Sequence, residues 1–192
     1  MPSCSRLFWS IIICSVIAGC DSRPQFRSTD ITGAPYGKAL ELADHTGKPR
    51  RLEDFRGKAV VLFFGFTHCP DVCPTTLAEI AVAVKQLGAD AERVQVLMVS
   101  VDPERDTPES LGKYVTAFDP RFLALRGDLA ATKKVAEEFK IYFEKAKSGD
   151  SYTVNHSAQS YVIDPHGRLR LLVRHDRIGQ DLAPDLRTLL RE

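Results

Sequence analysis

Residues 59–74 read AVVLFFGFTHCPDVCP and join a continuous apolar run to a pair of cysteines. The run 59–66 carries no charged side chain, which is typical of a central strand buried on both faces of a sheet. Apolar residues recur at helical spacing after Pro74, so a helix should follow the strand. The motif therefore places two thiols, Cys69 and Cys73, between a buried strand and the start of a helix.

The flanking segments alternate strands and helices. A second buried strand is expected over residues 94–101, and two further helices should start after the caps Thr107 and Asp128. The other expected elements are a hairpin across the turn at 44–47, a polar loop over 145–155, strands over 160–163 and 168–173, and a last helix carrying Leu182, Leu186, Leu189 and Leu190. This order predicts an α/β, thioredoxin-like domain, a central sheet flanked by helices, with an N-terminal hairpin and insertions. Periodicity alone also allows other open sheets.

The composition limits what the protein can bind. The chain has 192 residues, 44% of them hydrophobic, which is enough for one domain with an appendage. Its 26 Lys plus Arg balance 25 Asp plus Glu, and its aromatic content is 8%, so neither a basic surface nor stacking platforms are expected. Nucleic acid is therefore excluded as a partner. The five cysteines, Cys4, Cys14, Cys20, Cys69 and Cys73, are too sparse for a disulfide framework.

The amino-terminal segment has the pattern of an export signal. Residues 7–18 are uncharged and would form only about 18 Å of helix, which is too short for a hydrocarbon core of about 30 Å. The tetrapeptide IAGC at 17–20 resembles a bacterial lipobox, in which Cys20 receives a lipid and becomes the first mature residue. An ordinary secretory peptide or an uncleaved anchor is the alternative.

These features give a domain plan. We predict a lipoprotein signal peptide over 1–19, the lipidated Cys20 with a flexible polar tether over 20–35, and the folded domain over 36–192. Asp21 resembles the inner-membrane retention signal of enterobacterial lipoproteins. The predicted location is therefore the periplasm-facing side of a bacterial inner membrane, reached through a lipid anchor.

The position of Cys69 and Cys73 favours reactive thiols. Open α/β sheets bind ligands at the carboxyl ends of their strands, and a helix amino terminus stabilises thiolates. Four-residue spacing on a helix separates Cβ atoms by about 5 to 6 Å, which is more than the roughly 3.8 Å of a disulfide. The spacing favours a metal clip, while a disulfide needs only modest loosening of the loop. Two buried structural cysteines are the third reading.

A third ligand is needed to complete such a clip, and His156 is the best candidate. It precedes the strand expected over 160–163, and in thioredoxin-like folds the loop leading into that strand faces the redox motif. A lone loop histidine is more often solvated, so this alternative stays open. The other histidines fit less well: His45 and His166 fall in turns, His175 follows an edge strand, and His68 is a candidate modulator of the thiol pKa values.

Three separated motifs now carry a resemblance. The stretches FGFTHCPDVCPTTL, VSVDPERDTPE and NHSAQSYVIDPHG are similar, in order and placement, to those of the Sco/SenC family of copper chaperones. The resemblance implies a thioredoxin-like fold, membrane tethering, and copper bound by Cys69, Cys73 and His156. Asn155 departs from the aspartate that many relatives carry before the histidine, which puts a carboxylate beside the ligand in doubt.

The ligand set suits copper handling. Thiolates favour Cu(I), imidazole helps to tolerate Cu(II), and three-coordination leaves a position open for transfer. The first functional hypothesis is a non-enzymatic metallochaperone that supplies the binuclear copper site of cytochrome c oxidase. Its expected partners are the copper-bearing oxidase subunit, a copper donor chaperone or a thioredoxin-like reductant, and the membrane.

The second hypothesis is a thiol:disulfide oxidoreductase, in which Cys69 and Cys73 are a redox-active pair that reduces the cysteines of that oxidase site or acts in periplasmic redox homeostasis. A peroxidase is disfavoured because the peroxiredoxin pattern is missing, and zinc binding would leave the redox pair idle. Asp102 and Asp106 in the DPERD stretch are either groups that support the ligands or dock a partner, or parts of a solvated loop.

Overall fold

The computed structural model describes residues 24–192, so the predicted signal peptide and Cys20 lie outside the described residues. Eight strands form one sheet in the order β1-β10-β9-β4-β5-β6-β2-β3. Their bounds are β1 Thr29–Asp30, β2 Glu41–Asp44, β3 Pro49–Arg51, β4 Ala59–Gly65, β5 Val94–Ser100, β6 Leu123–Arg126, β9 Ser160–Ile163 and β10 Leu169–Val173. Between residues 24 and 192 there is no helix with the length and apolar character needed to cross a membrane.

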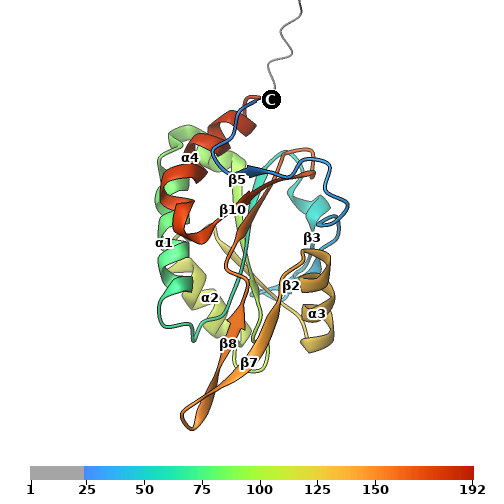
Figure 1. The fold of residues 1–192 in the computed structure, drawn as a ribbon, viewed down its shortest axis with the longest axis vertical. Coiled ribbons are helices and arrows are strands. Elements are labelled where there is room, and N and C mark those ends of the chain that lie inside the picture. Colours follow the sequence, from blue (N-terminus) through green and yellow to red (C-terminus); the bar gives the residue numbers. More distant parts are fainter. Residues whose placement is uncertain (1–23) are drawn as a thin grey trace, which may run out of the picture.

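Within the described residues, four α-helices cover the sheet. Figure 1 shows α1, α2 and α4 on one side and α3 on the other. Their bounds are α1 Val72–Lys85, α2 Pro108–Thr116, α3 Leu129–Glu138 and α4 Ile178–Leu189. The expected caps form: the Thr107 hydroxyl accepts from the Ser110 amide at 3.1 Å, and Asp128 accepts from the Ala131 amide at 2.7 Å.

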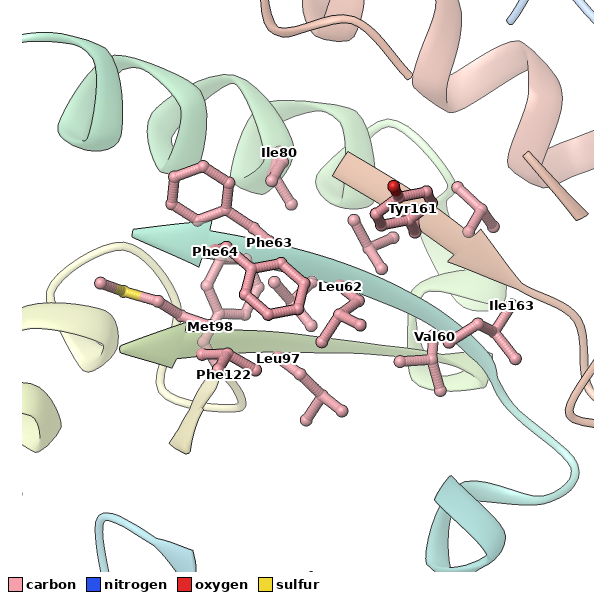
Figure 2. Close-up of a cluster of buried hydrophobic side chains, with 14 of the residues drawn as sticks. Val60, Leu62, Phe63, Phe64, Ile80, Leu97, Met98, Phe122, Tyr161 and Ile163 are labelled. Carbon is pink, nitrogen blue, oxygen red and sulfur yellow. The ribbon is translucent and has the colours of Figure 1, made fainter. Parts of the chain in front are cut away.

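Strand β4 forms the centre of the core, as the apolar run predicted. All of its residues are buried, and it pairs in parallel with β5 and antiparallel with β9. Figure 2 shows its side chains packed with those of β5, β9 and α1, including Phe64, Leu97 and Tyr161. Each large side chain buried in this way contributes about 1.5 to 3 kcal/mol. The core therefore fixes the carboxyl end of β4, from which the cysteine loop leaves.

The segment expected to be a tether through residue 35 is tied to the domain from Arg27 onward. The amides of Arg27 and Ser28 donate to the buried Asp185 carboxylate at 2.7 and 2.8 Å, and β1 pairs with β10. These contacts use backbone groups and one carboxylate rather than apolar side chains. Hydrophobic patterning therefore gave no sign of β1, and it also missed the four-residue strand β6.

The polar loop expected over 145–155 is instead a hairpin. Strands β7 Phe143–Ser148 and β8 Ser151–His156 pair antiparallel in a two-stranded sheet of their own. Most of its side chains are exposed or half-buried, and within β8 only Val154 is buried, so the sequence has the polarity of a loop. In Figure 1 the hairpin extends from the end of the molecule opposite to the first described residues and the carboxyl terminus.

Candidate metal centre

The two cysteines lie on either side of the start of α1. Cys69 is half-buried in the turn after β4, where its amide donates to the Phe66 carbonyl at 3.3 Å. Cys73 is in the first turn of α1 and is fully buried, whereas Cys69 keeps part of its surface exposed. The burial of Cys73 follows from the start of α1 at Val72, which turns the Cys73 side chain toward the core. Both thiols are free.

The two thiols have opposite electrostatic environments. The pKa of Cys69 is lowered to about 4, first by a hydrogen bond from the Cys73 thiol and then, against the opposing effect of burial, by His156 and the amides of Cys73 and Asp71. The pKa of Cys73 is raised well above its usual range, first by its hydrogen bond to Cys69 and then by burial. This environment therefore favours a thiolate at Cys69 only, because the Cys73 thiol donates its hydrogen bond to Cys69 and is also shielded from water.

His156 is the last residue of β8, and its ring faces the cysteines. Its Nε2 lies 3.7 Å from the Cys73 sulfur, and its Nδ1 lies 2.9 Å from the Ser157 carbonyl oxygen. Because a carbonyl only accepts, Nδ1 donates to Ser157, and Nε2 is the ring nitrogen that faces the sulfur atoms. The ring also packs edge-on against Phe66, with centroids 5.8 Å apart. The structure thus brings together all three predicted ligands.

The three side chains are close to a metal-binding arrangement without yet forming one. Within residues 24–192, no group of three or more His, Cys, Asp or Glu side chains could hold a metal ion as it stands. Bonds of about 2.3 Å to sulfur and about 2.0 Å to nitrogen in a trigonal site put the two ligand atoms about 3.8 Å apart. Cys73 and His156, at 3.7 Å, already have that separation.

Asp106 fixes the cysteine loop through hydrogen bonds to Thr67. It is fully buried and accepts from the Thr67 hydroxyl at 2.6 Å, from the Thr67 amide at 3.2 Å and from the Ser100 hydroxyl at 2.6 Å. Thr67 is two residues before Cys69, so Asp106 fixes the backbone from which that cysteine projects. The solvated-loop alternative for Asp106 is therefore wrong.

Asp102 is also buried, 1% exposed, but it faces the hairpin instead. It accepts from the Tyr152 hydroxyl at 2.9 Å and from Arg105 Nε. The Arg105 guanidinium stacks 3.8 Å from the centre of the Tyr152 ring and donates to the Tyr152 carbonyl at 2.8 Å. The residues 102–106, which we call the DPERD loop, thus contact both ligand-bearing segments.

The remaining histidines lie away from the sulfur atoms or point elsewhere. His68 is exposed, and its Nδ1 lies 3.0 Å from the Thr67 hydroxyl and 3.9 Å from Asp106. The thiol pKa values are shifted by other groups. The ring of His45 accepts from the Ala124 amide at 3.3 Å, whereas His166, in the turn between β9 and β10, and His175, just after β10, are both exposed.

The fold and the site can now be compared with known proteins. A family profile described as SCO1/SenC matches residues 28–191. The chain belongs to the SCO1/SenC family. The bovine mitochondrial SCO2 homolog is 39% identical over 170 residues, which cover 86% of this chain and 64% of that protein. The match therefore spans slightly less than two thirds of that relative's length.

Solved SCO1/SenC structures share the fold. The structure of Bradyrhizobium japonicum ScoI with copper bound is 39% identical, with a TM-score of 0.74, over 81% of this chain and 99% of that chain. A SCO1/SenC family lipoprotein from Bacillus anthracis is 25% identical, with a TM-score of 0.69, over 86% of this chain and 99% of that chain. The predicted family and the thioredoxin-like α/β fold are confirmed.

The SCO1/SenC site contains side chains that sequence reasoning missed. Arg105 and Tyr152 contact each other and Asp102, yet Tyr152 stood in a segment expected to be a loop. Tyr114 on α2 is a third side chain of this kind. Its pKa is raised, first by burial and then by the negative charges of the Cys73 and Cys69 thiolates, so the Tyr114 hydroxyl interacts electrostatically with both cysteines. The only sequence signal for Tyr152 was its spacing of four residues before His156.

Proposed function

We propose that this protein binds one copper ion through Cys69, Cys73 and His156 and delivers it to the binuclear copper site of cytochrome c oxidase. The observation that carries this proposal is the contact of His156 Nε2 with the Cys73 sulfur at 3.7 Å, beside a second thiol of low pKa. The Sco family is described as a family of cytochrome c oxidase assembly proteins.

The donor set favours copper over harder cations. Two thiolate sulfurs and one imidazole nitrogen are soft or intermediate ligands, which prefer Cu(I) over Mg²⁺, Ca²⁺ or Mn²⁺. The Cys69 thiolate is present at neutral pH, since its pKa is about 4, whereas Cys73 must lose its proton as the metal binds. The structure of a relative, Bradyrhizobium japonicum ScoI, contains bound copper, which supports copper as the metal that this protein binds.

The unequal exposure of the two thiols suits transfer to a partner. Cys73 and His156 hold their places through burial and a backbone hydrogen bond, whereas Cys69 is half-buried at the rim. A three-ligand site leaves one direction open to an incoming thiolate or imidazole. We infer that the recipient's ligand enters on the Cys69 side, where the least rearrangement of the protein is needed.

The substitution His156→Ala tests the proposal, with His166→Ala as the matched control on an exposed turn. The first variant should lose copper affinity and fail to support oxidase assembly when copper is limiting, because only two ligands remain. The control should behave as the wild type. Oxidase assembly by His156→Ala at limiting copper would reject metal delivery as the function.

A thiol:disulfide oxidoreductase is the second candidate, and the asymmetric pair favours it. A low-pKa, half-exposed Cys69 beside a buried, high-pKa Cys73 is the arrangement of an attacking and a resolving thiol. This activity would not need His156 as a ligand. The His156→Ala protein should then keep disulfide exchange with a thioredoxin-like reductant and keep its effect on assembly.

We further propose that lipid-modified Cys20 anchors the protein to the periplasmic face of the bacterial inner membrane. The support is the lipobox at 17–20 and the existence of a lipoprotein in the family. Because the domain is tied down from Arg27, only the six residues 21–26 separate Cys20 from the first residue that Asp185 holds. The Cys20→Ser protein should appear in the soluble periplasmic fraction and take up no labelled fatty acid, and membrane retention would contradict the anchor.

A further inference from the structure

The ligands of the candidate site come from two segments that share no strand pairing. The cysteine loop follows β4 of the main sheet, whereas His156 ends β8, and within the described residues β8 pairs only with β7. Backbone hydrogen bonds therefore fix the shape of the hairpin without fixing its place over the cysteines. Apart from the short chain link from His156 to Ser160 of β9, the separation of His156 from Cys73 is set by side-chain contacts between the hairpin and the body.

The DPERD loop supplies contacts to both segments. On one side Asp106 binds the amide and the hydroxyl of Thr67, next to the cysteine turn. On the other side Arg105 and Asp102 bind the carbonyl and the hydroxyl of Tyr152 in the hairpin. The DPERD loop thus fixes the position of the hairpin relative to the cysteine loop.

Tyr152 is well placed to transmit this constraint to His156. The two residues are four positions apart on β8, so their side chains project from the same face of the strand, and their Cα atoms are about 13 Å apart. The ring of Phe66 lies between the two contact regions, 5.9 Å from the Arg105 guanidinium carbon and 5.8 Å from the His156 ring. A rotation of the hairpin that moved Tyr152 would therefore also move His156.

Arg105 is not explained by stability alone. Its Nη2 is buried, and no hydrogen-bond partner for it is found among residues 24–192. The Arg105 side chain is 21% exposed, and a partly buried charge with an unpaired buried donor is a costly way to attach a hairpin, which apolar residues would do at lower cost. The planar Arg105 guanidinium donates to Asp102 and to the Tyr152 carbonyl at the same time, and an apolar side chain could not make these two bonds.

We propose that Arg105, Asp102 and Tyr152 are positioning residues that set the place of His156 over the cysteine pair. The inference rests on the proposed function, because it assigns these residues to the geometry of the same copper site. They do not touch the metal. Their effect passes through the hairpin to the imidazole, and it should disappear when the imidazole is absent.

The test compares Arg105→Gln and Tyr152→Phe with Lys145→Gln as the matched control. Lys145 also contacts the Tyr152 ring, at 4.6 Å, but its side chain is 44% exposed, so its ion pair with Glu104 is screened by water. Arg105→Gln should weaken copper retention by about 10-fold or more and shift the thiolate-to-Cu(II) absorption band. Tyr152→Phe should act in the same direction, whereas Lys145→Gln should match the wild type.

Combination with His156→Ala separates positioning from general destabilisation. In that background Arg105→Gln should cause no further loss of copper, because the residue through which it acts is gone. Arg105→Lys should not restore retention, since an ammonium cannot both stack and bind two acceptors. An Arg105→Gln effect that persists without His156, or that equals the effect of Lys145→Gln, would overturn the proposal.

A measurement on the metal-free protein tests the positioning role of Arg105 even if the proposed copper-binding function fails. If copper retention in the wild type does not depend on His156, the ligand set is wrong. Amide hydrogen exchange in the β7–β8 hairpin of the metal-free protein then decides the positioning role. Exchange should be about 10-fold faster in Arg105→Gln than in Lys145→Gln, and equal rates would reject the role.

Discussion

Gly65→Ala probes the contact between the end of β4 and the buried thiol. A Cβ atom at Gly65 would lie 2.6 and 2.9 Å from two ring carbons of Phe63 and 3.1 Å from the Cys73 sulfur. Ordinary contacts are about 3.5 to 4.0 Å, and Phe63 is fully buried, so its ring cannot move into solvent. The backbone or Cys73 must therefore shift to admit a single methyl group.

The magnitude follows from two opposing terms. Overpacking of this kind costs about 1 to 3 kcal/mol, and the reduced freedom of the unfolded chain returns about 0.4 to 1 kcal/mol. A net loss of about 1 to 2 kcal/mol would lower Tm by roughly 2 to 8 °C in a domain of this size. The displaced Cys73 should also weaken copper retention, since its spacing to His156 changes.

The assay is thermal and urea unfolding of the metal-free protein, followed by copper competition with a chelator. Gly179→Ala in α4 is the matched control, because a Cβ there would come no closer than 3.5 Å, to the Glu79 carboxylate. That variant should be stabilised by about 0.5 kcal/mol, as expected when alanine replaces glycine in a helix. Wild-type stability and copper retention in Gly65→Ala would refute the packing account.

Three further predictions concern buried hydrogen bonds and the reactive thiol. Asp106→Ala should lower the unfolding free energy by about 3 kcal/mol in urea titrations, because the Thr67 amide and two hydroxyls lose their acceptor. Tyr161→Phe should cost about 1 to 2 kcal/mol in the same titration, since the hydroxyl donates to the buried Phe139 carbonyl at 2.7 Å. In the metal-free protein Cys69 has a pKa lowered from 9.0 to about 4, so its alkylation rate should stay level from about pH 8 to about pH 6 and fall only as pH drops through about 4; an ordinary thiol would slow about tenfold per pH unit from the start.

The features that the sequence could predict are those encoded by local patterns. The central strand was predictable because every side chain of β4 is apolar and buried, and the starts of α2 and α3 because Thr107 and Asp128 are followed by helix-forming residues. The cysteine pair was predictable as a site because its spacing has a direct chemical meaning.

Contacts between distant polar residues could not be predicted in this way. The β7–β8 hairpin is polar on most of its surface, and its Tyr152 is held by Asp102 and Arg105, which are 50 and 47 residues earlier in the chain. The burial of Asp106 depends on donors from β5 and from the cysteine turn. Likewise β1 is fixed by Asp185 from the far end of the chain. Local patterns carry no information about such partners.

The most direct test of the central claim is X-ray absorption spectroscopy of the purified protein loaded with Cu(I), with the metal content measured on the same sample. The account predicts one copper per chain, with two sulfur neighbours and one nitrogen neighbour, and the loss of that nitrogen in His156→Ala. Copper bound only by sulfur in the wild type, or an unchanged nitrogen neighbour in His156→Ala, would contradict the assignment of Cys69, Cys73 and His156 as the copper ligands.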